Sequence, residues 1–228
     1  MCAIVGCYLQ NPSSDDFDLI SNVLLESSIR GLHATGVSWI RDGKIHTHIE
    51  KLPARNFLQK FDIEKTVNED GNLYMVGHCR YSTSDLNYNQ PLYNNNISIV
   101  HNGVVSQEMP ENWEKIYGYK CTTKNDSELI LHTLEAKKSP LVEFAEASMA
   151  VVELYRDKTI RFYRNGKRPI YFTSMKNGGI ITSTKNIAIR SKLNSPKEVP
   201  MNMYLTAVNG TMKKEIVNIE NAKDLQHV

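Results

Sequence analysis

The feature that most constrains the fold is a recurring pair, Asn or Asp followed by Gly, that stands between two short apolar runs. Asp42-Gly43, Asn165-Gly166 and Asn209-Gly210 all show this pattern. Because these residues tolerate the positive φ of tight turns, the pattern predicts β-hairpins, among them one between residues 161–164 and 169–172. The sheets are therefore expected to be antiparallel.

Helical signals lie between the hairpins. Ser13, followed by Asp16 three residues later, is typical of a helix N-terminus. Further helices are expected at residues 56–61, 126–134, 141–146 and 186–192. Strands and helices mix without the regular alternation of a parallel sheet, which favours an α+β layered fold. Because no linker or low-complexity tract divides the chain, residues 1–228 are expected to form a single domain.

Charge and hydropathy exclude some classes of partner. The 27 basic and 25 acidic residues are spread along the chain without a basic block, so nucleic acid is not an expected partner. No apolar run approaches the length of about 18 residues that a membrane span needs. The start of the chain has no signal-peptide pattern, so a cytoplasmic protein without a membrane partner is expected.

The four cysteines are Cys2, Cys7, Cys79 and Cys121. They form no Cys-x-x-Cys pair, and their spacing offers no zinc ligand set, so no metal and no cofactor are expected. A cytosolic cysteine is usually buried and inert. Cys2 has an alternative role, because removal of Met1 would leave its thiol and a free α-amino group on one residue. The amino group, with a pKa of about 7.7 to 8.0, could act as the base for the thiol.

The segment from Gly77 to Thr83 follows the apolar run 73–76 and is expected where a strand gives way to a loop. Arg80 could bind a substrate carboxylate through paired hydrogen bonds, with the hydroxyl group of Ser82 or Thr83 beside it. The alternative is a surface ion pair.

His101-Asn102-Gly103 follows the apolar run 97–100. Asn-Gly is also a strong hairpin signal, so a turn is one interpretation. The other is an oxyanion hole, in which the side-chain amide of Asn102 and the backbone N–H of Gly103 stabilise a developing negative charge.

Asp126 stands where a helix is expected to begin and could simply cap it. A carboxylate at this position could instead bind a substrate ammonium group. Together with Arg80, it would then hold the α-amino-acid end of a substrate.

These segments occur in one order along one chain, and they resemble the class II, or N-terminal-nucleophile, glutamine amidotransferases. The matching segments are residues 1–6, 30–36, 77–83, 101–103 and 125–128, with a weaker similarity at 164–171. The resemblance implies a four-layer αββα sandwich, in which two antiparallel sheets lie between helices.

The resemblance also implies a role for each residue. Cys2 would attack the side-chain amide of glutamine, and Asn102 and Gly103 would stabilise the oxyanion. Arg80 and Asp126 would hold the carboxylate and amino groups of the substrate. The supporting residues would be Thr83 at the carboxylate, Arg30 and Gly31 in a loop beside the nucleophile, and Tyr81, Ser82, His78 and His101 around the site.

Three hypotheses follow. The first is a glutaminase that passes ammonia to a separate synthetase or transferase, because no synthase segment is expected in this chain. The second is a stand-alone hydrolase of γ-glutamyl compounds. The third is a catalytically silent binding module, against which the retention of Cys2, Arg80, Asn102 and Asp126 argues.

Overall fold

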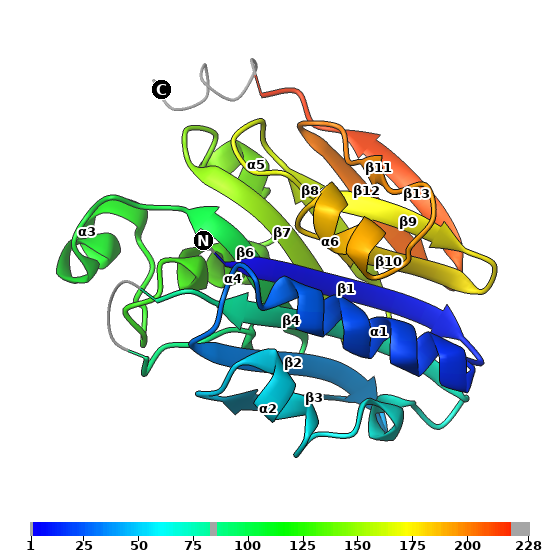
Figure 1. The fold of residues 1–228 in the computed structure, drawn as a ribbon. Helices are drawn as coiled ribbons and strands as arrows, with labels where there is room; N and C mark the ends of the chain where they lie inside the picture. Colours follow the sequence, from blue (N-terminus) through cyan, green and yellow to red (C-terminus); the bar gives the residue numbers. More distant parts are fainter. Residues whose placement is uncertain (1, 83–85, 220–228) are drawn as a thin grey trace.

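The computed structural model describes residues 2–82 and 86–219. Two β-sheets pack face to face, and helices cover their outer faces (Figure 1). All the strand pairings of the described residues are antiparallel. The predicted α+β fold of four layers, with two antiparallel sheets between helices, is confirmed.

The first sheet has the strand order β11-β9-β10-β1-β4-β2-β3. Its strands are β1 (Ala3–Gln10), β2 (Ala34–Arg41), β3 (Lys44–Glu50), β4 (Asn72–Arg80), β9 (Tyr171–Met175), β10 (Gly178–Thr182) and β11 (Lys197–Glu198). Its central strands β1 and β4 are almost completely buried, because helices cover one face and the second sheet covers the other.

The second sheet has the strand order β13-β12-β8-β7-β6-β5. Its strands are β5 (Leu92–Tyr93), β6 (Ile97–Val104), β7 (Ser148–Tyr155), β8 (Ile160–Arg164), β12 (Met203–Val208) and β13 (Thr211–Ile216). Its contacts with the first sheet run mainly from β6 and β7 to β1 and β4.

The helices form the two outer layers. They are α1 (Ser14–Ser27), α2 (Ala54–Leu58), α3 (Trp113–Tyr117), α4 (Ser127–Glu135), α5 (Pro140–Glu143) and α6 (Lys185–Arg190), with 3-10 turns at Ile63–Thr66 and Pro110–Asn112. Helix α1 contacts β1, β4, α2 and α6, whereas α4 contacts β5, β6 and α5. The side chain of Ser13 accepts a hydrogen bond from the Asp16 N–H and caps α1 as predicted.

Strand alternation sorts the side chains of β1 between two cores. Val5 and Cys7 face α1, whereas Ile4 and Tyr8 belong to the core between the sheets. Since successive strand residues point to opposite faces, Cys2 lies on the side of Ile4, toward the second sheet. The fold thus turns the start of β1 into the space between the sheets.

Two of the predicted hairpins are confirmed. Asp42-Gly43 joins β2 to β3, and Asn209-Gly210 joins β12 to β13. The hairpin expected around Asn165-Gly166 is wrong, because β8 pairs with β7 and β12 while β9 lies in the other sheet. The side chain of Asn165 instead holds the start of β7, where its Oδ1 accepts the Met149 N–H at 3.1 Å.

Within the described ranges, no helix is long and apolar enough to cross a lipid bilayer.

Candidate functional site

The antiparallel pairing of β1 with β4 brings Cys2 next to the end of β4. Ala3 lies opposite Cys79, so the residues that precede β1 and follow β4 meet at one edge of the sheet. The segment from Gly77 lies where a strand ends, as expected, and β4 continues as far as Arg80 before Tyr81 and Ser82 leave it. Strand pairing rather than a loop therefore sets the position of Arg80 relative to Cys2.

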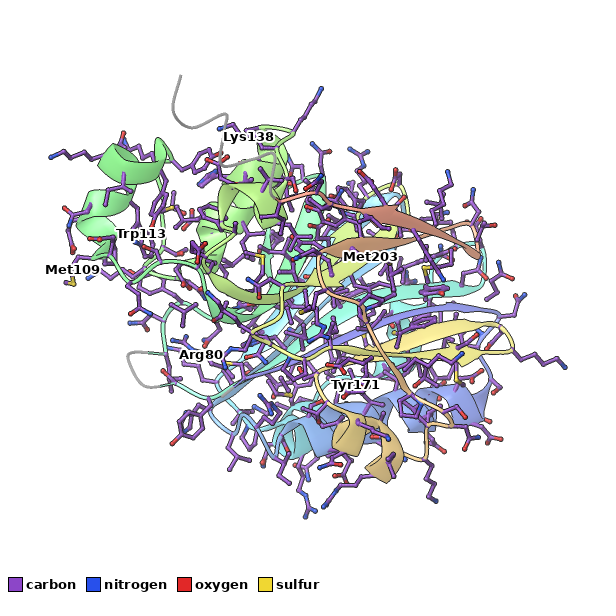
Figure 2. All side chains as sticks on the ribbon, turned by 90° about the horizontal axis from the view of Figure 1, so that it is seen from above. Arg80, Met109, Trp113, Lys138, Tyr171 and Met203 are labelled. Atoms are coloured by element: carbon purple, nitrogen blue, oxygen red, sulfur yellow. The ribbon has the colours of Figure 1, made fainter. Side chains whose placement is uncertain are left out.

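A cleft of about 460 Å³ opens at this edge and brings together residues from distant parts of the chain. The predicted residues in its lining are Cys2, His78, Arg80, Tyr81, Ser82, His101, Gly103 and Asp126. In Figure 2, Arg80 lies at the same end of the molecule as Trp113, which also lines the cleft. A slightly larger, mostly apolar hollow between β9, β11, β12 and β13 is lined by none of the predicted residues.

Cys2 differs from the cysteines in the neighbouring strands. It is half-buried, and its Sγ lies 3.8 Å from the carbonyl oxygen of Tyr81. Cys7 and Cys79 are fully buried, and burial raises the pKa of Cys79 to about 12 and that of Cys7 further. Of these three thiols, only that of Cys2 lines the cleft.

The loop that carries Arg30 and Gly31 packs against both Cys2 and β4. The Nε of Arg30 donates a hydrogen bond to the Cys2 carbonyl at 2.9 Å. A Cβ atom on Gly31 would lie 2.3 Å from the carbonyl oxygen of Cys79, which explains why this position requires glycine. The loop and the end of β4 therefore fix the main chain on each side of the thiol.

Replacing Gly31 tests this packing. Gly31→Ala is expected to lower the free energy of unfolding by about 2 kcal/mol or more and to reduce turnover, because the added methyl group meets backbone that cannot move aside. Gly77→Ala is the matched control, since its Cβ would meet the flexible end of Leu24 at 3.3 Å. Denaturant unfolding of both variants measures the difference, and equal losses would contradict this role of the loop.

Asn102 and Gly103 lie inside β6, opposite Ala150 and Met149 of β7. Both the turn interpretation and the placement beyond the end of a strand are therefore wrong. Gly103 has a φ of 153°, and a Cβ there would lie 1.8 Å from the carbonyl oxygen of Ser148. The glycine is thus required by a close backbone approach within the sheet.

The amide of Asn102 is buried and points into the core between the sheets. Its neighbour on the same face, Val100, belongs to that core, and Asn102 itself is 4% exposed. Among the described residues, its Nδ2 has no hydrogen-bond partner. A buried amide without a partner costs about 1–3 kcal/mol, which is a burden commonly retained where the donor serves a ligand.

His101 faces the opposite side of β6, toward α4. Its Nδ1 lies 2.8 Å from the Ser127 Oγ and its Nε2 lies 3.2 Å from the Ser148 carbonyl. A carbonyl can only accept, so Nε2 carries the proton and Nδ1 accepts from the Ser127 hydroxyl. Both nitrogens of a neutral ring are thus engaged, which suits a supporting role.

His78 lies on the inner face of β4 and lines the cleft, and it is 1% exposed. Its ring nitrogens have no hydrogen-bond partner among the described residues. Burial, followed by the charge of Arg80, lowers the pKa of His78 to about 3. The ring is therefore neutral at physiological pH and cannot act as a general acid there.

This burial predicts a pH dependence of stability. Between about pH 3 and the ordinary histidine value of 6.5, the unfolded chain binds a proton at His78 that the folded chain does not. The stability is thus fully present above pH 6.5 and falls with decreasing pH by up to about 1.4 kcal/mol per pH unit. Burial also lowers the pKa of His101, which adds to the same slope.

His78→Gln is expected to reduce the slope of the free energy of unfolding against pH by the contribution of close to one proton, because the neutral amide does not titrate. Denaturant unfolding at pH 5 to 7 gives the slope for both proteins. A slope that His78→Gln leaves unchanged would show that another group causes the loss of stability.

Asp126 occupies the N-cap position of α4, yet its side chain does not cap the helix. Its Oδ2 instead accepts hydrogen bonds from the backbone N–H groups of Val105 at 2.6 Å and Ser106 at 3.2 Å. The simple capping interpretation is therefore wrong. The carboxylate ties the loop after β6 to the start of α4 at the wall of the cleft.

Arg80 is held by the segment that precedes β6. Its Nη1 donates to the carbonyl of Tyr88 at 2.6 Å and to the Oδ1 of Asn89 at 2.8 Å. The Tyr88 carbonyl also accepts from the Asn125 side chain at 3.2 Å, which links Arg80 to the residue before Asp126. The anchored guanidinium group therefore lies at the wall of the cleft.

Tyr81 and Ser82 continue from β4 along the cleft. The Ser82 N–H donates to the Nδ1 of His33 at 2.8 Å, and the Tyr81 ring packs against the same imidazole at 5.0 Å. Thr83 lies outside the described residues, so its predicted contact with a substrate carboxylate stays a prediction.

The sequence patterns did not single out Gln90. Its side chain is buried and pairs with both backbone groups of His101, accepting from the N–H at 2.6 Å and donating to the carbonyl at 3.2 Å. Gln90 thus fixes the outer edge of β6 beside Asn102. It lies in an asparagine-rich segment that carries no local motif, so only the fold reveals this role.

Comparison with known families gives one match over most of the chain. The family model described as the glutamine amidotransferase domain matches residues 62–226. This range includes Arg80, Asn102 and Asp126 and does not reach Cys2. Comparison with curated proteins gives no significant match.

Solved structures show where the fold has been seen before. The Bacillus subtilis glutamine phosphoribosylpyrophosphate amidotransferase, complexed with ADP and GMP, is 17% identical with a TM-score of 0.73, and the match covers 96% of this chain and 50% of that one. A structure described as the allosteric regulatory enzyme of purine biosynthesis is 18% identical with a TM-score of 0.74, covering 96% and 49%. The present chain therefore spans about half the length of both.

A third structure has nearly the same length as this chain. It is a glutamine aminotransferase class-II domain protein from Silicibacter pomeroyi, 12% identical with a TM-score of 0.57, and the match covers 95% of this chain and 99% of that one. At these identities the three structures establish the fold.

Proposed function

The chain belongs to the glutamine amidotransferase domain family, with the fold of its class II members, and on this premise we propose that it hydrolyses the side-chain amide of glutamine with Cys2 as the nucleophile. The ammonia passes to a separate synthetase or transferase. The observation that carries the proposal is that Cys2, Arg80, Gly103 and Asp126 line one cleft, while Asn102, the residue before Gly103, has a buried Nδ2 without a hydrogen-bond partner among the described residues.

The reaction begins once Met1 has been removed, because the α-amino group of Cys2 then becomes available. That amine takes the thiol proton, and the thiolate attacks the amide carbon of glutamine. The Nδ2 of Asn102 and the N–H of Gly103 stabilise the oxyanion of the tetrahedral intermediate. The amine returns its proton to the leaving nitrogen, and ammonia departs from a γ-glutamyl thioester.

Water completes the cycle. The α-amino group accepts a proton from the water that attacks the thioester, and glutamate leaves as the thiol is restored. Neither histidine is required in these steps. This agrees with the neutral, hydrogen-bonded ring of His101 and the low pKa of His78.

Two charged groups suit the ends of the substrate. We assign the α-carboxylate of glutamine to Arg80, whose guanidinium group is already oriented by Tyr88 and Asn89. We assign the ammonium group to Asp126 through Oδ1, because both of its backbone hydrogen bonds go to Oδ2. Both groups line the cleft that Cys2 enters.

An assay of both products on several substrates tests the proposal. Equal amounts of glutamate and ammonia from glutamine, at a rate that rises when the acceptor enzyme is added, are the expected result. Turnover of γ-glutamyl peptides without turnover of glutamine would assign the cleft to a γ-glutamyl hydrolase. Absence of turnover on either substrate by protein without Met1 would favour a silent binding module.

A further inference from the structure

A second cluster of reactive side chains lies on the outer side of α4. Cys121, Glu128 and His132 place a thiol sulfur, a carboxylate oxygen and an imidazole nitrogen within 4.8 Å of one another. We propose that this cluster binds a divalent transition-metal ion of the zinc type. None of the three side chains takes part in the proposed glutamine chemistry, so the two proposals stand independently.

The helix supplies two of the three ligands. Glu128 and His132 are four residues apart on α4, and this spacing places both side chains on one face. Cys121 approaches the same face from the segment between α3 and α4. Its spacing from the other cysteines gives no sequence signal, which is why the cysteine pattern predicted no metal.

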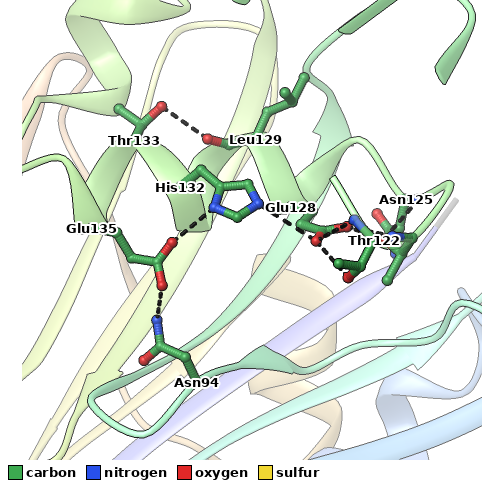
Figure 3. A network of polar contacts seen from close by, with 9 residues as sticks. Asn94, Thr122, Asn125, Glu128, Leu129, His132, Thr133 and Glu135 are labelled. Carbon is green, nitrogen blue, oxygen red and sulfur yellow. Dashed lines mark hydrogen bonds and ion pairs between the residues drawn. The ribbon is translucent and has the colours of Figure 1, made fainter. Parts of the chain in front are cut away.

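The hydrogen bonds of His132 fix the tautomer that a metal requires. Its Nδ1 lies 2.8 Å from the Oε2 of Glu135, and a carboxylate can only accept, so Nδ1 carries the proton (Figure 3). The Oε1 of Glu135 is in turn held by Asn94 at 2.7 Å. Metal-binding histidines commonly show this arrangement, in which a carboxylate orients the ring from behind.

In the neutral ring the opposite nitrogen then presents its lone pair to the cluster. The Nε2 of His132 is buried and has no hydrogen-bond partner among the described residues, and it lies 3.5 Å from the Oε1 of Glu128. The Nε2 lone pair and the negative carboxylate repel each other across this distance unless a cation or a proton lies between them. The separation is close to the roughly 3.3 Å between an imidazole nitrogen and a carboxylate oxygen on one tetrahedral zinc ion.

Glu128 is already ordered for this role. Its two oxygens accept four hydrogen bonds from the backbone and hydroxyl groups of Thr122 and Thr123, at 2.6–2.8 Å. The carboxylate is therefore held in one orientation beside Cys121 and His132.

Cys121 supplies the preference for a soft metal. Its sulfur lies within 4.8 Å of the ligand atoms of Glu128 and His132. A bound zinc ion displaces the thiol proton to solvent and forms a metal–thiolate bond. Thiolate and imidazole ligands together favour zinc over calcium or magnesium. The bound ion would join the segment before α4 to the helix that follows Asp126.

Cobalt(II) titration tests the site, because cobalt bound to a thiolate gives a charge-transfer absorption that oxygen and nitrogen ligands do not. The titration is carried out on the full chain with Cys2→Ala, since the thiol and α-amine of Cys2 could themselves chelate metal. One equivalent of cobalt and a thiolate band are expected. The same titration of a protein that carries both Cys2→Ala and Cys121→Ser should give no thiolate band.

Two further variants distinguish an organised metal site from side chains that lie close together by chance. Glu135→Ala, which removes the carboxylate behind the ring, should weaken cobalt binding by about tenfold or more. Glu114→Ala, on the exposed side of α3, should leave binding unchanged. Absence of a thiolate band in the Cys2→Ala protein would overturn the proposal, and so would a band that persists in Cys121→Ser or an affinity that Glu135→Ala leaves unchanged.

Discussion

Cys2→Ala is expected to lower kcat for glutamine hydrolysis by at least about a thousandfold, because among the described residues that line the cleft only Cys2 carries a thiol that can form the thioester. Alanine is small enough for Met1 still to be removed, so the variant keeps the α-amino group and loses only the sulfur. The release of glutamate, monitored with a coupled enzyme assay, measures the change in kcat. Arg80 and Asp126 remain, so the variant should still bind glutamine.

Cys7→Ala is the matched control for this prediction. Cys7 lies in β1, the strand that follows Cys2, but it faces α1 and is fully buried, and burial raises the pKa of its thiol. Its loss should cost some stability without changing kcat. Comparable loss of turnover in the two variants would mean that the strand as a whole, and not the thiol of Cys2, supports activity.

Asn102→Ala lowers kcat by about a hundredfold to a thousandfold, which is the usual effect of removing one oxyanion donor. The free energy of unfolding of this variant should fall little or even rise. The variant removes a buried amide whose Nδ2 has no partner within the described part of the chain, so the lost packing is offset by the lost desolvation cost. Kinetics and denaturant unfolding of the same protein measure the two effects.

Ser98→Ala is the control from the same strand and the same face. Ser98 is four residues before Asn102, and its Oγ is likewise buried without a partner among the described residues. It lies further from the cleft, so its loss should leave kcat unchanged. A kcat for Asn102→Ala within about threefold of the unmodified protein would remove Asn102 from the oxyanion hole.

Together these variants examine a site that the sheet geometry creates. The start of β1, the end of β4 and the last residues of β6 meet at one edge of the two sheets. Strand alternation directs Ile4 and Val100 into the core between the sheets, and Cys2 and Asn102 follow the same alternation. The proposed nucleophile and the proposed oxyanion donor are therefore positioned by the strands of the two sheets.

The sequence predicted the hairpins correctly where the Asn-Gly pair serves only as a turn between two strands. Asn209-Gly210 is a simple hairpin turn, and its prediction is confirmed. Asn165-Gly166 looks the same in sequence, but the side chain of Asn165 bonds to Met149 and the chain then crosses to the other sheet. A local pattern cannot reveal a partner that is distant in sequence.

The same limit applies to the site. The resemblance identified Asn102-Gly103, yet only the structure shows that Gly103 is required by the approach of Ser148 within the sheet. The hydrogen bonds of Gln90 to His101 join an irregular segment to β6 and leave no periodic signal. Residues that orient the site through long-range hydrogen bonds are therefore the ones that sequence reasoning misses.

The state of the N-terminus tests the central claim most directly. The protein is incubated with a diazoketone analogue of glutamine, and the intact mass and the modified peptide are then determined. We expect a chain that lacks Met1, with one adduct on the sulfur of Cys2 and activity lost in proportion to labelling. An adduct on any other residue, or full activity in protein that retains Met1, would contradict the assignment of Cys2 as the nucleophile.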